Sequence, residues 1–153
     1  MLLQPGHWLG RGSILVEGHS LGTTAECDVR IERDEGGLTL RAELRAQDAP
    51  PREYVVRVVS NDIGTYTLHV QTGAEVLHGT AKLDSAPNLG LLWHDSGGVY
   101  ATFTLFSISA GCGLRGFLRD GTTVFTWEIA FSLKQDVVQS DNVISLRSRP
   151  RRR

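Results

Sequence analysis

Apolar and polar residues alternate along most of the chain, the period expected of β-strands that bury one face. In residues 25–32 every odd position is apolar and every even position is charged, and residues 38–45 repeat the alternation with Thr39 as the one uncharged polar position. The segment between them, Arg33–Gly37, ends in two glycines that favour a turn. These two runs predict an antiparallel hairpin.

The same alternation predicts eight further strands, separated by segments rich in Gly, Asn, Asp, Ser and Pro. They span about 6–18, 53–60, 64–71, 74–84, 98–109, 113–119, 122–134 and 142–149. No window carries a sustained helical period. Ser85–Leu92, which contains Pro87, is predicted as a short helix or an irregular lid.

About ten antiparallel strands joined by tight turns predict an all-β fold with two sheet edges to protect. Closure into a barrel removes both edges, so a single up-and-down barrel is expected, with a packed two-sheet sandwich as the alternative. Ten strands enclose a wider interior than the eight that already hold one small ligand. We expect one domain over residues 1–149 and a basic tail over 150–153.

Charge is distributed unevenly along the 153 residues, although the formal net charge is only −1. Five of the last seven residues are arginine, which leaves 11 basic and 17 acidic side chains in the rest of the chain, a net charge of −6. An acidic body is a poor ligand for phosphate backbones, so a nucleic-acid partner is not expected. The arginine end is interpreted as a solvated terminus, with a contact to nucleic acid or anionic lipid as the alternative.

Membrane and export segments are not expected either. No stretch approaches the roughly 20 apolar residues of a membrane span, and Pro5 and Gly6 interrupt the N-terminal apolar residues too early for a signal peptide. Cys27 and Cys112 lie apart, outside any metal-binding or redox motif. Two isolated thiols indicate a reducing, cytoplasmic location.

The most specific motif is G-x-W-x-G-x-G at residues 6–12, formed by Gly6, Trp8, Gly10 and Gly12. At the chain's own Gly and Trp frequencies a chance match is expected roughly 0.004 times. Glycines at alternate strand positions permit sharp bending and close approach of a neighbouring backbone. We therefore interpret the glycines as structural, with Trp8 closing the barrel floor.

This motif resembles the calycin superfamily, and most specifically the nitrobindin-like and fatty-acid-binding-protein-like barrels, which open with it. The resemblance implies a ten-stranded barrel of this length. In lipocalin-type relatives the tryptophan packs under an arginine of the last strand. The resemblance implies that Arg147 or Arg149 takes this role here. Such a cation–π contact contributes about 1 kcal/mol.

The chain departs from the nitrobindins at their haem ligand. Those proteins bind haem through a histidine just before the final strand, but the matching stretch here, residues 138–142, reads Val-Gln-Ser-Asp-Asn. An amide or carboxylate is a poor substitute for imidazole on haem iron. No cofactor is therefore predicted, and haem is disfavoured.

His69 and His78 are the most suggestive pair of metal-ligating residues. A two-residue turn at Thr72-Gly73 would set His69 opposite Val76 and place His78 diagonally across on the same face. Without a third ligand the pair is interpreted as two solvated exterior histidines, and no metal site is predicted.

Aromatic residues favour a ligand-binding interior. Phe125 and Trp127 begin an alternating file that is expected to face inward, because exposure would leave an apolar ridge. Side chains expected to line the pocket are Trp127, Phe125, Phe103, Tyr100 and Trp93, with His78 or His94 as a polar handle.

Three functions follow as hypotheses. The first is a binding module for a small hydrophobic or aromatic molecule. The second is haem-dependent nitrogen-oxide chemistry with His78 or His94 as an unusual ligand. The third is a barrel with a filled core that acts in structure or interaction, as a homodimer through one wall. No nucleophile, metalloprotease or phosphate-binding motif indicates an enzyme, and no catalytic residue is assigned.

Overall fold

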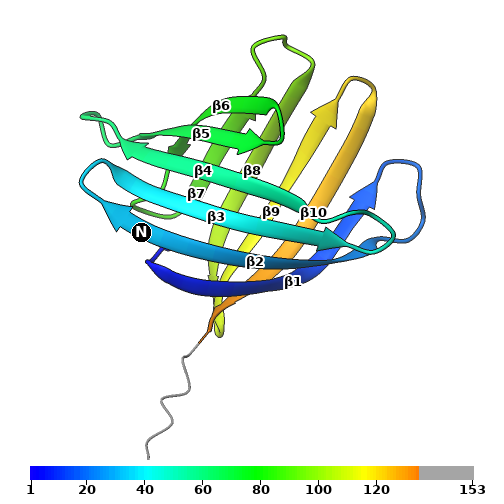
Figure 1. Ribbon diagram of the computed structural model, residues 1–153, viewed down its shortest axis with the longest axis horizontal. Helices are drawn as coiled ribbons and strands as arrows, with labels where there is room; N and C mark the ends of the chain where they lie inside the picture. The colour runs from blue at the N-terminus through cyan, green and yellow to red at the C-terminus, as the bar shows by residue number, and fades with distance from the viewer. Residues whose placement is uncertain (135–153) are drawn as a thin grey trace, which may run out of the picture.

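The computed structural model describes residues 1–134, which form ten β-strands in one closed barrel (Figure 1). The strands are β1 (Gly6–Val16), β2 (Thr23–Asp34), β3 (Gly37–Ala46), β4 (Arg52–Ser60), β5 (Tyr66–Thr72), β6 (Glu75–Lys82), β7 (Asn88–Trp93), β8 (Val99–Ile108), β9 (Gly111–Asp120) and β10 (Thr123–Leu133). The all-β, up-and-down barrel predicted from the alternation is confirmed. No helix that could span a membrane occurs within residues 1–134.

Closure of the barrel comes from pairing between its first and last strands. Each strand pairs antiparallel with its neighbour in the chain, and β10 returns to β1 in a register that runs from Trp8↔Leu133 to Val16↔Phe125. Every strand therefore has two hydrogen-bonded neighbours, which removes the edges that a two-sheet sandwich would leave open.

One strand within residues 1–134, β7, was not expected from the sequence pattern. The expectation of a helix or lid over Ser85–Leu92 is wrong, because β7 begins at Asn88 and pairs with both β6 and β8. Its three inward positions, Asn88, Gly90 and Leu92, include a polar residue and a glycine, which hid the alternation. The strand expected at 142–149, the domain boundary at 149 and the motif partner Arg147 lie outside the described residues.

The two ends of the barrel differ, and we name them by their connections. The floor comprises residues 1–5 and connections 35–36, 61–65, 83–87 and 109–110; the mouth comprises connections 17–22, 47–51, 73–74, 94–98 and 121–122. The best-buried large side chains, Leu38, Val58 and Leu83, lie toward the floor. Each contributes about 1.5–3 kcal/mol to folding.

The N-terminal residues complete the floor. Met1, Leu2 and Leu3 pack against the core cluster that contains Trp8. Trp8 is 9% exposed, and its indole Nε1 donates a hydrogen bond to the backbone oxygen of Gln4 at 2.9 Å. The tryptophan is thus fixed between the core and the N-terminal segment, as expected of a floor residue.

The glycines of the motif allow close strand contact. A Cβ atom at Gly12 would collide with the backbone oxygen of Glu128 on β10, and one at Gly10 would meet the ring of Phe131. Gly10 and Gly12 therefore permit the close approach of β10 to β1, which is the role expected from their spacing.

Candidate binding site in the barrel interior

Inward-facing aromatic rings lie against glycines of the neighbouring strands. Gly90 is covered by the ring of Phe103, and Gly116 by the indole of Trp127. A Cβ atom at either glycine would overlap the ring atoms. The glycines thus make room for the two rings along the inner wall, a known way for aromatic side chains to stabilise glycine-containing sheets.

On β4, and on β10 from Ile129 onward, inward positions become less buried toward the mouth. On β4, Val58 is 2% exposed, whereas Tyr54, nearer the mouth, is half-buried. On β10, Ile129 is 5% exposed, whereas Trp127 and Phe125 are half-buried. On β2, β6 and β8, by contrast, Ala25, Leu77 and Ala101 stay buried near the mouth, and Leu133 at the floor end of β10 is 46% exposed. The half-buried apolar side chains near the mouth therefore lie on one part of the wall, which includes β4 and β10.

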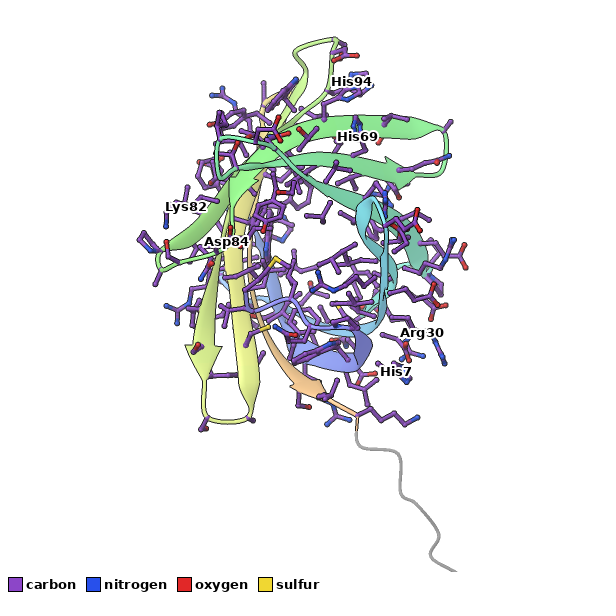
Figure 2. The ribbon with its side chains drawn as sticks, turned by 90° about the vertical axis from the view of Figure 1, so that its left-hand side faces the viewer. His7, Arg30, His69, Lys82, Asp84 and His94 are labelled. Carbon is purple, nitrogen blue, oxygen red and sulfur yellow. The ribbon has the colours of Figure 1, made fainter. Side chains whose placement is uncertain are left out.

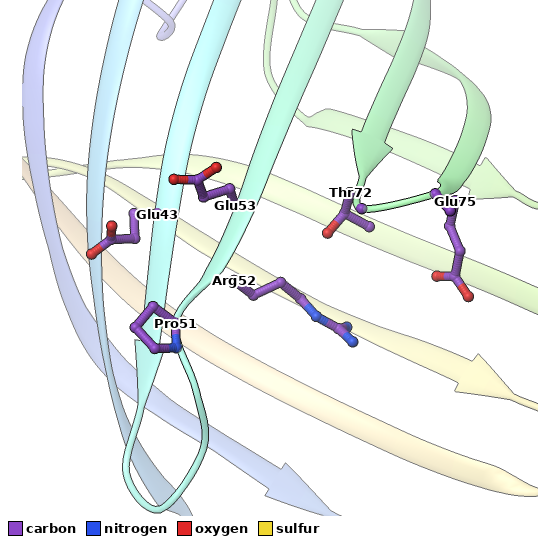
Figure 3. Close-up of a pocket in the computed structure, with 8 residues that line it drawn as sticks. Glu43, Pro51, Arg52, Glu53, Thr72 and Glu75 are labelled. Carbon is purple, nitrogen blue, oxygen red and sulfur yellow. The ribbon is translucent and has the colours of Figure 1, made fainter.

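A groove of about 550 Å³ indents the wall beside the mouth (Figure 3). Pairing between β4 and β5 stops at Val55↔Gln71, so the first residues of β4 have no β5 partner there. Figure 3 shows Arg52 extending from β4 toward Thr72 and Glu75 at the β5–β6 turn. The groove is lined by Glu43, Pro51, Arg52, Glu53, Thr72, Gly73, Ala74 and Glu75.

Away from the strand ends, the polar groups on the inner wall are uncharged. Within residues 1–134, the charged side chains at inward positions stand only at strand ends: Arg33, Arg52, Glu75 and Asp120. Burial raises the pKa of the Cys27 thiol from 9.0 to about 11, although Arg45 partly opposes that shift. The interior therefore disfavours a negative charge.

The predicted lining residues separate into two groups. Trp127, Phe125 and Phe103 face inward, as expected. Tyr100 and Trp93 face outward, with 43% and 38% of their surface exposed, so the expectation that they line the interior is wrong. The reason is parity, because residues an odd number of positions apart on a strand face opposite sides.

His78 joins this outward group, in the register row that runs from His69 through His78 and Trp93 to Tyr100. Tyr100 also lies beside Phe117, with ring centroids 6.5 Å apart. Together His69, His78, Trp93, Tyr100 and Phe117 form an outer row of aromatic rings across β5 to β9. The sequence pattern did not show that these side chains gather there.

The turn between β5 and β6 differs from the expected one by a residue. Thr72 pairs with Glu75, so the turn residues are Gly73 and Ala74, and His69 lies directly opposite His78 rather than diagonal to it. Their ring centroids are 5.3 Å apart at 84°. Both histidines lie on the outer face as predicted, and no group of three metal-ligating side chains occurs within residues 1–134.

Haem does not fit the histidines that were considered for it. His78 lies outside the barrel, with its Nε2 3.3 Å from Asp95 Oδ2. His94 lies in the mouth connection after β7, where its Nδ1 accepts a hydrogen bond from the Ser96 backbone N–H at 3.1 Å (Figure 2). None of the five histidines occupies an inward strand position, so none presents an imidazole from the inner wall.

Two inward residues escaped the sequence reasoning. Tyr54 shares its face with Val56 and Val58, so the period of two would have identified it. Asn88 had no such signal, because its segment was interpreted as a lid.

Searches of protein-family models, curated proteins and solved structures find no match for this chain. The structure shows a closed ten-stranded antiparallel barrel, which is compatible with a calycin-like fold.

Proposed function

We propose that the barrel binds a small hydrophobic or aromatic molecule in its interior. The observation that carries this proposal is that, on β4 and β10, the inward side chains of Tyr54, Phe125 and Trp127 are only half-buried, whereas Val58 and Ile129 on the same strands are buried. An apolar guest that covers such surface gains about 25 cal/mol for each Å² removed from water. The mouth is the end at which a ligand would enter.

The same proposal includes a family assignment. The G-x-W-x-G-x-G motif, its place on the first strand and the ten-stranded barrel support membership of the calycin superfamily, near the fatty-acid-binding-protein-like barrels. Carriage of a small apolar ligand is the general role that this resemblance implies.

Two phenylalanine substitutions on opposite faces test the proposal. Ala42→Phe adds a ring at an inward, half-buried position of β3, whereas Ala130→Phe adds the same ring at an exposed outward position of β10. We expect N-phenyl-1-naphthylamine, an uncharged fluorescent probe, to bind the unmodified protein saturably. Ala42→Phe should weaken its binding at least tenfold, because the ring occupies ligand space, and Ala130→Phe should leave it unchanged.

Circular dichroism establishes that both variants are folded before the titration. Absence of saturable fluorescence in the unmodified protein would rule out the binding function. Equal affinities of the two variants would place the probe outside the interior.

A second proposal concerns self-association through the outer row. Trp93, Tyr100 and Phe117 are each about two-fifths exposed on adjacent strands, an apolar surface of the kind found at interfaces. We expect a homodimer in sedimentation velocity that the double change Trp93→Ser, Tyr100→Ser converts to a monomer. A monomeric unmodified protein at 100 μM, a concentration set on the order of weak homodimer affinities, would contradict this proposal.

A further inference from the structure

Asn88 is the one buried polar side chain within residues 1–134, and it faces the interior. It is 7% exposed and opens β7 at an inward position, opposite Leu105 of β8. The next inward position on β7 is Gly90, over which the ring of Phe103 lies. The carboxamide is thus set among apolar groups, next to an aromatic ring of the proposed pocket.

The carboxamide makes no hydrogen bond with any described residue. Its side chain has no partner among the side-chain hydrogen bonds of residues 1–134, yet no fully enclosed side-chain nitrogen or oxygen there lacks one. Since the Asn88 amide has no such partner, its nitrogen and oxygen are not fully enclosed and each retains some solvent-accessible surface. A buried amide that is still open to hydrogen bonding is a group that a ligand can satisfy.

The surroundings restrict the charge of a group that binds there. The charged side chains at inward positions stand at strand ends, and none lies beside Asn88 on the inner wall of the described barrel. A carboxylate or ammonium group at that depth would lose its hydration without gaining an opposite charge. The raised pKa of Cys27, also an inward residue, shows the same penalty on a negative charge.

We infer that the interior selects a neutral amphipathic molecule, such as an alkyl alcohol or amide, whose polar head hydrogen-bonds to the Asn88 carboxamide while its apolar part lies along Phe103 and Trp127. This inference rests on the proposed binding function and specifies its ligand class. The carboxamide both donates and accepts hydrogen bonds, so it satisfies a hydroxyl or amide head completely.

Competition between ligands that differ only in their head group tests the inference. Decanol, decanoate and decylamine are titrated at pH 7.4 against bound N-phenyl-1-naphthylamine, and displacement of the probe gives the affinity of each. We expect decanol to bind at least tenfold more tightly than either charged analogue. Asn88→Leu, which keeps the branched shape and removes the polar group, should weaken decanol binding at least fivefold and leave the affinity for the probe within twofold.

A second variant keeps the test decisive if Asn88→Leu does not fold. Asn88→Asp has the same shape, and the ammonium group of decylamine can pair with its carboxylate, so this variant should gain affinity for decylamine relative to decanol. Thr104→Val, which also removes a polar group but lies on the outer face of β8 opposite Leu89, is the control and should change none of the affinities.

The outcomes separate the inference from the function on which it rests. Decanoate or decylamine binding as tightly as decanol, or undiminished decanol binding by Asn88→Leu, would overturn the inference while the binding function stands. Failure of every compound, the probe included, would overturn the binding function itself.

Discussion

Single side chains decide which face of the wall carries which chemistry. Tyr100 and Phe103 are three positions apart on β8, so one lies in the outer row and the other on the inner wall. Composition marks both as ligand contacts, but only strand parity separates them. The alternation was sufficient to place Phe125 and Trp127, whereas Asn88 required the structure because one polar residue at the start of a strand carries no period.

Gly12 offers a direct test of the motif at this scale. Gly12→Ala should destabilise the protein by about 1–3 kcal/mol or more, because its Cβ would overlap the Glu128 backbone oxygen, which cannot move without disturbing β10. Gly98→Ala is the matched control, since the nearest atom to its Cβ would be Ser96 Oγ at 3.6 Å. Urea denaturation measures both, and equal stabilities would show that β1 does not need a glycine there.

Cys27 gives a prediction about pH. Because burial raises its pKa from 9.0 to about 11, the folded protein at pH 8 holds roughly 100-fold less Cys27 thiolate than the unfolded chain. In a Cys112→Ala background, labelling by a disulfide reagent should be slower than in denaturant by at least that factor. Labelling rates within tenfold of each other would contradict the burial of this thiol.

The same shift has a consequence for stability. The folded state retains the Cys27 proton to higher pH than the unfolded state, so this contribution to stability is complete below pH 9.0 and is lost between pH 9.0 and about 11. Cys27→Ala should therefore lose less stability than the parent protein across that interval.

Pairing between elements explains the two places where the predicted strands needed correction. A one-residue difference in the β5–β6 turn brings His69 directly opposite His78, because turn geometry, which the apolar pattern does not contain, sets the register of a hairpin. The short β7 was missed because Gly90 and Asn88 occupy inward positions that are usually apolar. Long strands with regular alternation, such as β2 and β3, were predictable within one or two residues.

Like charges meet across β3 and β4, which predicts a stabilising change. Glu43 is directly opposite Glu53, and Asp28 on β2 flanks it on the other side. Glu53→Lys should stabilise the protein by about 0.2–1 kcal/mol, since opposite charges then face each other. Glu17→Lys, in the connection after β1, is the control for the change in net charge.

Thermal unfolding at low and high salt measures this effect. The gain of Glu53→Lys over Glu17→Lys should shrink in 1 M NaCl, where the Debye length falls to about 3 Å. Equal melting temperatures of the two variants at low salt would show that the Glu43–Glu53 repulsion is negligible.

At the scale of the whole molecule, the barrel follows from the need to satisfy every strand edge. The alternation favoured closure but left a two-sheet sandwich as the alternative, and the pairing of β1 with β10 decides for the barrel. The covering of one end of the barrel was not predictable, because it depends on how Met1–Leu3 pack against the core cluster and how Trp8 bonds to Gln4. A barrel that is covered at one end is a candidate for holding a ligand in its interior.

Contact quenching by 10-bromodecan-1-ol is the most direct test of ligand binding inside the barrel, because the bromine quenches only a tryptophan that it touches. Trp127 lies on the inner wall and Trp93 in the outer row. A binding site inside the barrel predicts saturable quenching of tryptophan fluorescence in the unmodified protein. The quenching should be retained in Trp93→Phe and lost in Trp127→Phe. Quenching that disappears with Trp93 and persists without Trp127, or no saturable quenching at all, would contradict a binding site inside the barrel.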